Sequence, residues 1–353
     1  MSAPRPPVDL DALVAATVAI GFSEGVARRG LEAELEAWSD EAIARALAAE
    51  LAPVPAWRAH APRVALVIAA RTLPASAIRQ VLAARVLGAR VLLKSASGQE
   101  ALGEAIARLD PGIVPTPFAS SDVAALDRAL AESDVVVVLG SDETVAAVRA
   151  RVPGDHGFVG HGHRASAAWL ADDAPDADVT GLAEDLCAWD QAGCLAPHVA
   201  WVDGDPARLG ERLARALEVI ERDPARAPTP HDAHARHLHR QAATLAIMAG
   251  GRAWRSAQAT LATHPDPAFR VSPGARLLWL LPADAGALAA FEPRLSSLAL
   301  GAGLAPPIAL GPHVRLCRPG QLQRPPLDWH QDGLPLFASL LVKGVGSAPP
   351  ISA

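Results

Sequence analysis

The sequence predicts an α/β protein in which a doubly wound parallel sheet is followed by a second, mixed α/β lobe. Short unbroken apolar runs, of which residues 134–139 (DVVVVL) are the clearest, are typical of strands covered on both faces. Helical stretches alternate with these runs from residue 63 onward, and the connections between them are short. Half of the 353 residues are apolar and a fifth are charged, so the chain has enough apolar surface for a buried core.

Predicted helices precede the first lobe. Apolar residues recur at three and four positions in 9–20 and 31–51, and the acidic residues after Ser39 are a helix start signal. Prolines within 53–62 end this helical stretch. In the lobe itself, the predicted strands are 64–69, 90–94, 113–114 and 134–139, and the predicted helices are 73–87, 99–109, 122–132 and 144–151.

The second lobe is predicted from a less regular pattern. The Gly/His stretch 160–164 and the Pro/His/Ala-rich stretch 224–236 are expected to be loops. The predicted strands are 198–202 and 276–281, and the predicted helices are 181–188, 207–222, 241–250 and 286–300. The chain is thus expected to consist of an N-terminal helical segment 1–60, a first lobe 61–160, a second lobe 161–325 and a C-terminal tail 326–353.

Several classes of protein are disfavoured by composition. A net charge of −6 provides no basic field for nucleic acid, and no apolar run is long enough to predict a membrane span. The N-terminal sequence MSAPRPPVDLDAL has neither an apolar signal core nor a transit pattern, which predicts a cytoplasmic protein. Three cysteines with no CxxC pair argue against a disulfide framework.

Cys194 is the candidate nucleophile. It follows Gly193 in the sequence WDQAGCLAP, just before an apolar strand, where backbone freedom and exposed amides let a thiol attack while its own N–H holds an oxyanion. The alternative is that Cys194 is a small buried apolar residue, which on spacing alone is the commoner outcome. Cys187 and Cys317 lie in apolar surroundings and are predicted to belong to the core.

Two further features indicate a nucleotide site. Gly140 and Ser141 follow a predicted buried strand and begin a helix, whose free N–H groups suit a phosphate; a plain strand-to-helix turn is the alternative. Lys94 ends another strand and is followed by Ser95 and Ser97, at the sheet edge where a nucleotide ribose binds. The alternative for Lys94 is an isolated surface lysine.

The histidines do not predict a metal site. His161 and His163 lie beside Arg164 without a clear third ligand. A second group lacks the Glu of an H-E-x-x-H motif and is expected to be a solvated run that caps a helix. This second group consists of His231, His234, His237 and His239.

Taken in order, four segments resemble the aldehyde dehydrogenase superfamily, and specifically its LuxC-type branch of long-chain fatty acyl-CoA reductases. Weaker similarity extends over 69–97 and the stretch near 254–282, so the resemblance covers most of 63–340. It implies a Rossmann-type doubly wound cofactor lobe and an α/β catalytic lobe that carries the cysteine. The four segments are VLGSDETVAAVR (138–149), GHGHRASAAWL (160–170), DLCAWDQAGCLAPH (185–198) and RLCRPGQLQRPPLDWHQDG (315–333).

The resemblance implies NADPH as the cofactor. Lys94, with Ser95 beside it, falls on the lysine that contacts the adenosine ribose or its 2′-phosphate. Gly140 and Ser141 fall on the Gly-Ser pair that opens the helix facing the pyrophosphate. This chain lacks the second glycine that follows the pair in the superfamily.

The resemblance also implies catalytic roles. Cys194 falls on the catalytic cysteine, with Gln191 placed as in that motif. Thr72 stands where the superfamily has the Asn that holds the oxyanion. The sequence GHGHR stands where aldehyde-oxidising relatives have a segment with a general-base Glu. Without that Glu, the resemblance implies that no residue activates water to hydrolyse the acyl-enzyme. His161 or His163 is then the candidate for proton transfer.

The expected reaction is NADPH-dependent reduction of an acyl-CoA or acyl-protein thioester to an aldehyde through a Cys-linked acyl-enzyme. A related alternative is another Cys-dependent, acyl-activating dehydrogenase, for example one that acts on an acyl phosphate. An alternative from a different class is a catalytically degenerate scaffold that binds a nucleotide or a partner protein. Two features favour this alternative: the chain has Thr72 in place of the Asn, and it is short for the family on its N-terminal side. A homo-oligomer and an acyl-transfer partner protein are both left open.

Overall fold

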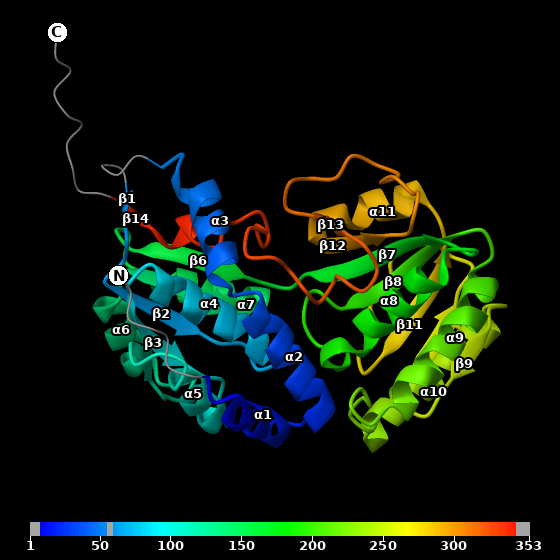
Figure 1. Ribbon diagram of the computed structural model, residues 1–353, viewed down its shortest axis with the longest axis horizontal. Helices are drawn as coiled ribbons and strands as arrows, with labels where there is room; N and C mark the ends of the chain where they lie inside the picture. The colour runs from blue at the N-terminus through cyan, green and yellow to red at the C-terminus, as the bar shows by residue number, and fades with distance from the viewer. Residues whose placement is uncertain (1–7, 55–58, 344–353) are drawn as a thin grey trace, which may run out of the picture. The chain divides into compact units, whose positions relative to one another are not determined.

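The computed structural model describes residues 8–54 and 59–343, which form two compact units (Figure 1). The first unit consists of Met1–Ile20, Glu34–His163 and Pro326–Ala353, and the second of Gly21–Ala33 and Arg164–Pro325. Each unit has its own sheet. Among the described residues, no helix is long and apolar enough to cross a membrane.

The first unit contains a five-stranded parallel sheet in the order β4-β3-β2-β5-β6. The chain moves outward from β2 to β4 on one side and then returns to add β5 and β6 on the other. This reversal beside β2 is the switch point of a doubly wound sheet. The strands are β2 (Val64–Ile68), β3 (Arg90–Lys94), β4 (Ile113–Pro115), β5 (Val135–Leu139) and β6 (Gly157–His161).

The helices of this unit follow the predicted alternation. Ser39, Asp122 and Ser141 each accept a backbone N–H at the start of a helix, which satisfies a donor that has no partner within the helix. All five residues of β5 are buried, as expected of a strand covered on both faces. The helices are α1 (Leu10–Ala19), α3 (Asp40–Leu51), α4 (Pro74–Val86), α5 (Glu100–Ala107), α6 (Val123–Glu132) and α7 (Asp142–Arg149), while α2 (Glu24–Glu36) crosses the division between the units.

The segment that follows Pro326 is part of the first unit, which differs from the separate tail expected from the sequence. The buried carboxylate of Glu50 accepts the backbone N–H groups of Leu336, Phe337 and Ala338 at 2.9, 2.6 and 3.0 Å. The ring of Phe337 is fully buried and lies 6.3 Å from that of Trp38. A short strand pair, β1 (Ala59–His60) with β14 (Val342–Lys343), adds a further connection.

The second unit contains a seven-stranded sheet in the order β13-β12-β7-β8-β11-β10-β9, in which only β9 is antiparallel. Its strands are β7 (Ala165–Ala171), β8 (Pro197–Asp203), β9 (Ala253–Arg255), β10 (Thr260–Thr263), β11 (Leu277–Pro282), β12 (Leu295–Leu300) and β13 (Arg315–Cys317). Its helices are α8 (Asp176–Cys187), α9 (Pro206–Arg222), α10 (Ala233–Met248) and α11 (Ala285–Phe291).

Three expectations about elements are wrong. The predicted helix 286–300 ends at Phe291, because Pro293 cannot donate a helical N–H, and the rest is the fully buried strand β12. The predicted loop 224–236 already contains the start of α10, which is capped by Asp232. The predicted loop 160–164 is shorter than expected, because its first two residues complete β6 and only 162–164 connect β6 to β7.

Candidate active site

Most of the predicted cofactor and proton-handling residues lie along one edge of the sheet in the first unit. Its five strands are parallel, so their carboxyl ends share this edge. Lys94 ends β3, Gly140 and Ser141 follow β5, and His161 ends β6. Thr72 is exposed in the turn between β2 and α4. The strand order therefore brings together residues that are far apart in the sequence.

Lys94 is a buried cation surrounded by hydroxyl groups. Its Nζ donates to Ser120 Oγ at 3.2 Å and lies 5.7 Å from the centre of the Phe118 ring. The Oγ atoms of Ser97 and Ser120 are 3.4 Å apart. Burial lowers the pKa of Lys94, and the carboxylate of Glu100 opposes this shift. An ammonium group with hydroxyls at a carboxyl edge suits a ribose or a phosphate.

Ser95 directs its side chain toward the adjoining helix. A Cβ added to Gly103 of α5 would lie 3.0 Å from Ser95 Oγ, so the helix approaches the end of β3 closely at this point. Ser95 is partly buried, and it shares the edge with Lys94. Its predicted contact with a cofactor stays a prediction.

Gly140 and Ser141 have the local geometry expected of a phosphate-binding turn. Gly140 donates its N–H to His161 O at 3.1 Å, and a Cβ at Gly140 would lie 3.3 Å from the side chain of Thr144. Ser141 caps α7 by accepting Thr144 N–H at 3.2 Å. The first turn also carries Asp142 and Glu143, whose negative charges oppose an anion at this helix end.

His161 is held by a carboxylate. Its Nδ1 lies 2.8 Å from Asp332 Oδ2, and the two side chains are only 5% and 7% exposed. Because a carboxylate accepts, Nδ1 is the donor in this hydrogen bond, which fixes the orientation of the ring. His163 differs, since its backbone N–H donates to Asp142 Oδ1 at 2.9 Å. No sequence signal could link Asp332 to a histidine 171 positions away.

The loop that carries Cys194 lies in the second unit and has an unusual backbone. It connects the 3-10 turn η1 (Ala188–Gln191) to β8. Trp189, Asp190 and Gln191 have φ values of 50°, 52° and 65°, which non-glycine residues rarely adopt. Such a run of left-handed residues persists only where surrounding contacts hold it.

Gln191 provides one set of these contacts. Its buried Nε2 donates to Pro197 O and Leu277 O, both at 2.7 Å. Its Oε1 accepts Leu277 N–H at 2.9 Å and the Ser272 hydroxyl at 3.3 Å. Both donors and both acceptor positions of the amide are used, so Gln191 fixes the loop to β8 and β11.

Asp190 provides the second set. Its carboxylate pairs with the guanidinium of Arg276, which is only 1% exposed, and accepts the hydroxyl and N–H of Thr229. Arg276 also donates to the carbonyls of Thr229 and Gln258, each at 2.6 Å. The sequence analysis missed this network, because its members are separated by up to 86 positions.

Cys194 differs from the other cysteines in its place in a loop, since Cys187 ends α8 and Cys317 ends β13. It is partly exposed, as is Cys317, and its carbonyl accepts the Ser166 hydroxyl from the start of β7 at 2.8 Å. Burial raises the pKa of Cys187 to about 12 and that of Cys317 to about 11. Both of those thiols stay protonated at neutral pH and cannot act as nucleophiles.

A histidine that the sequence analysis did not select lies four residues after the cysteine. His198 is on β8, and its Nδ1 accepts Ser272 N–H at 2.9 Å, which leaves the proton on Nε2. Burial lowers the pKa of His198 to about 4, so the ring is neutral at pH 7. Ser272 therefore contacts both this ring and the amide of Gln191.

The second histidine group is not a solvated run throughout. His239 is buried and contacts Thr260 Oγ1 at 3.0 Å and Gly274 O at 3.2 Å, while the His231 ring lies 4.4 Å from it. The helix cap is Asp232 rather than a histidine. In the described part of the chain, no group of three or more His, Cys, Asp or Glu side chains could hold a metal ion.

The fold is that of the aldehyde dehydrogenases. The NADP-dependent glyceraldehyde-3-phosphate dehydrogenase from Bacillus halodurans C-125, solved with NADP, aligns with a TM-score of 0.64 at 14% identity, over 96% of this chain and 86% of that one. An NAD-dependent aldehyde dehydrogenase from Sinorhizobium meliloti aligns with a TM-score of 0.62 at 18% identity, over 97% and 80%. Both sheets of this chain thus belong to a known oxidoreductase fold.

A family model for acyl-CoA reductase (LuxC) matches residues 39–284, which include both the Lys94 edge and the Cys194 loop. The chain therefore belongs to the LuxC acyl-CoA reductase family. No curated protein matches the sequence. Family and fold together support an oxidoreductase that acts on acyl-CoA and aldehyde groups.

Proposed function

We propose that this protein is an NADPH-dependent reductase that converts a fatty acyl thioester to an aldehyde through an acyl-enzyme on Cys194. The observation that carries the proposal is the construction of the Cys194 loop. Three left-handed residues are held by the Gln191 amide and the Asp190–Arg276 pair, in front of a partly exposed cysteine. Backbone strain maintained by a buried network is typical of functional sites.

The edge of the first sheet fits a nicotinamide dinucleotide. Lys94, Ser95 and the nearby hydroxyls would hold the adenosine ribose and its 2′-phosphate, while Gly140 and Ser141 would face the pyrophosphate. The buried ammonium group of Lys94 favours the extra phosphate of NADPH. When bound, NADPH supplies the hydride that reduces the acyl group.

The residues of the chain perform the remaining steps. The Cys194 thiolate attacks the thioester carbonyl, the C–S bond to CoA breaks, and CoA leaves as a thiolate with little need for an acid, because thiol pKa values are near 8.5. The Cys194 N–H and the Thr72 hydroxyl would stabilise the oxyanion. After reduction, the hemithioacetal on Cys194 collapses to the aldehyde as its C–S bond breaks and the Cys194 thiolate leaves. His161, oriented by Asp332, or His163 would accept the hydroxyl proton that this collapse releases.

The proposed reaction has consequences for the substrate, the location and the partners of the enzyme. An acyl thioester carried by CoA or by a protein is the acyl donor, and CoA or the carrier thiol is released. The cytoplasm, which supplies NADPH and CoA, remains the predicted location. Whether a second copy or an acyl-transfer protein binds to the enzyme stays open.

Intact-mass spectrometry tests the proposal directly. The protein is incubated with acyl-CoAs of different chain length, first without and then with NADPH. We expect an acyl adduct on Cys194 that disappears when NADPH is added. Cys194→Ser should form no adduct, whereas the control Cys317→Ser should behave like the wild type. Folded wild-type protein that forms no adduct with any acyl-CoA would contradict the reductase and leave the scaffold hypothesis.

A further inference from the structure

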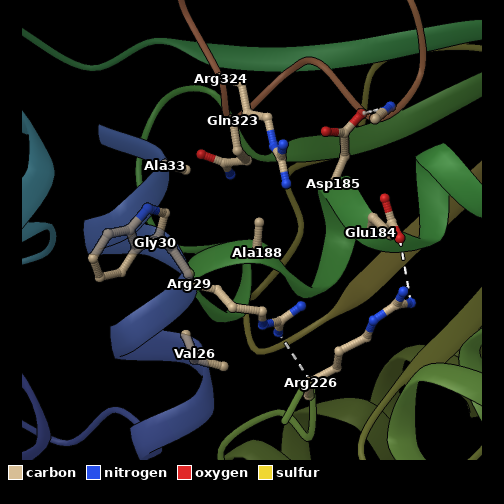
Figure 2. A pocket seen from close by; sticks show the side chains of 12 residues that line it. Val26, Arg29, Gly30, Ala33, Glu184, Asp185, Ala188, Arg226, Gln323 and Arg324 are labelled. Carbon is tan, nitrogen blue, oxygen red and sulfur yellow. Dashed lines mark hydrogen bonds and ion pairs between the residues drawn. The ribbon is translucent and has the colours of Figure 1, made fainter. Parts of the chain in front are cut away.

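The second unit contains a cavity of about 160 Å³ that the proposed reaction does not use. This volume far exceeds the roughly 10–15 Å³ that one water molecule needs. Figure 2 shows Arg29 and Arg324 directing their guanidinium groups from opposite sides toward the space beside Ala188, with Gln323 next to Arg324. These residues come from α2, from η1 and from the segment that follows β13.

Two of the arginines in the cavity lack a carboxylate partner. Within the described residues, the Arg29 guanidinium donates to two backbone carbonyls, those of Gly25 at 3.3 Å and Arg226 at 3.0 Å. Throughout residues 8–54 and 59–343, no carboxylate lies within ion-pair distance of Arg29 or Arg324. Burial lowers the pKa of Arg29, and the carboxylates of Glu184 and Asp223 oppose this shift without pairing with its guanidinium.

The acidic side chains beside the cavity are engaged elsewhere. Glu184 pairs with Arg226 at 3.3 Å. Asp185 accepts the backbone N–H groups of Gly320 at 2.6 Å and Leu322 at 3.0 Å. Burial also raises the pKa of Asp185 to about 7, which reduces its negative charge near neutral pH. Among the described residues, neither carboxylate lies within ion-pair distance of Arg29 or Arg324, although the charge of Glu184 acts on Arg29 from further away.

A third donor completes the set. The side-chain Nε2 of Gln323 is buried and has no hydrogen-bond acceptor among the residues that the structure describes. A buried N–H group without an acceptor is unfavourable, and native proteins contain few of them. An acceptor in the cavity would satisfy this amide and both guanidinium groups together.

We propose that this cavity binds a phosphate group, either as free phosphate or as part of CoA. The donors on Arg29, Gln323 and Arg324 come from separate segments and require a ligand with acceptors in several directions. A phosphate has oxygens in a tetrahedral arrangement and carries the charge that two unpaired guanidinium groups match, whereas a carboxylate presents two oxygens in one plane. As a site for CoA, the cavity would bind part of the substrate of the proposed reductase and rests on that proposal. As a site for free phosphate, it needs neither Cys194 nor a nicotinamide cofactor.

Calorimetric titration of the full chain tests the site. The probes are inorganic phosphate, CoA and dephospho-CoA, in chloride buffer of constant ionic strength. Arg324 is exposed and has no ion pair among the described residues, so Arg324→Gln should fold normally. We expect this change to weaken binding of the phosphate-bearing probe by about tenfold or more. Gln323→Glu should weaken it too, by repulsion, and the control Arg215→Gln, on the exposed surface of α9, should not.

The pattern across the probes identifies the source of the phosphate. Loss of inorganic phosphate binding alone assigns free phosphate. Loss of CoA affinity that spares dephospho-CoA assigns the 3′-phosphate, and loss for both assigns the diphosphate. If neither phosphate nor CoA binding depends on Arg324, the proposal is overturned. Cys194→Ser should bind the phosphate probe normally, which separates this outcome from failure of the proposed reductase.

Discussion

Gln191 shows how one side chain can determine the position of a reactive loop. Its amide contacts the backbone of β8 and β11 and leaves no hydrogen-bonding position unused. The motif that contains Gln191 and Cys194 was visible in the sequence, but the function of the glutamine was not. Its partners near Leu277 lie 86 positions further along the chain. At this scale, the local sequence identifies the candidate nucleophile but not the hydrogen bonds that position its loop.

Gln191→Leu should therefore destabilise the protein strongly. The change removes the amide partners of Pro197 O and Leu277 N–H in the interior, and each such group costs about 1–3 kcal/mol, whereas Leu277 O keeps the Ser272 hydroxyl at 2.7 Å. We expect a loss of about 3 kcal/mol or more in the free energy of unfolding, measured by urea denaturation. Gln321→Leu, at an exposed position in the same unit, is the matched control and should change stability by less than about 0.5 kcal/mol. Equal stabilities of the two variants would contradict the positioning role.

His239 should make stability depend on pH. Burial lowers its pKa from 6.5 to about 4, so the unfolded chain binds more protons than the folded one between these values. Stability contributed by the neutral ring is present above about pH 6.5 and is lost as the pH falls toward 4, by up to about 3 kcal/mol. His239→Asn should flatten this part of the profile in urea denaturation at several pH values. The exposed His237→Asn, on the same helix, should retain the wild-type slope.

At the scale of elements, the sequence predicts strands well where apolar runs are continuous and poorly where small polar residues interrupt them. β3 and β5 were predicted nearly to the residue. β6 (GFVGH) and β12 (LSSLAL) were missed, because glycine and serine weaken the apolar pattern although both strands lie inside their sheets. The order of the strands, which aligns Lys94 with Gly140, depends on pairing between distant segments and has no local signal.

Lys94 should contribute to cofactor choice through its place at the end of β3. Lys94→Ala removes the cation from the sheet edge and should weaken NADPH binding by about tenfold, with a smaller effect on NADH, in a fluorescence titration. Lys343 is the other lysine in the sequence and is exposed, so Lys343→Ala is the control. An equal loss for both cofactors, or no loss for either, would refute the role in binding the 2′-phosphate.

At the scale of the whole molecule, each unit is assembled from segments that are distant in sequence. The first unit takes its last segment from beyond Pro326, and Glu50 binds that segment through three backbone N–H groups. The sequence offered no signal for this, because a glutamate on an amphipathic helix is normally solvated. The same C-terminal segment also places Asp332 in hydrogen-bond contact with His161. Both contacts depend on the topology, which residue patterns alone do not determine.

Glu50→Gln should weaken the attachment of the segment 336–338 to α3. An amide offers one acceptor oxygen in place of two and directs an NH₂ group at backbone donors, so at least one of the three hydrogen bonds is lost. We expect faster amide hydrogen exchange at Leu336, Phe337 and Ala338, by about tenfold, in hydrogen-exchange mass spectrometry. Glu41→Gln, in the exposed first turn of the same helix, should leave exchange there unchanged. Unchanged exchange in Glu50→Gln would show that the segment is held by its apolar side chains instead.

The left-handed run before Cys194 also has a consequence for how the chain is made. Its backbone is held by Leu277 and Arg276, which are synthesised 86 residues after Gln191 and Asp190. On the ribosome, the cysteine therefore emerges long before the groups that place it. A nascent chain carries Cys194 as an ordinary thiol, and the loop acquires its final form only when β11 pairs with β8. Thiol reactivity at this position thus reports the completion of the second sheet.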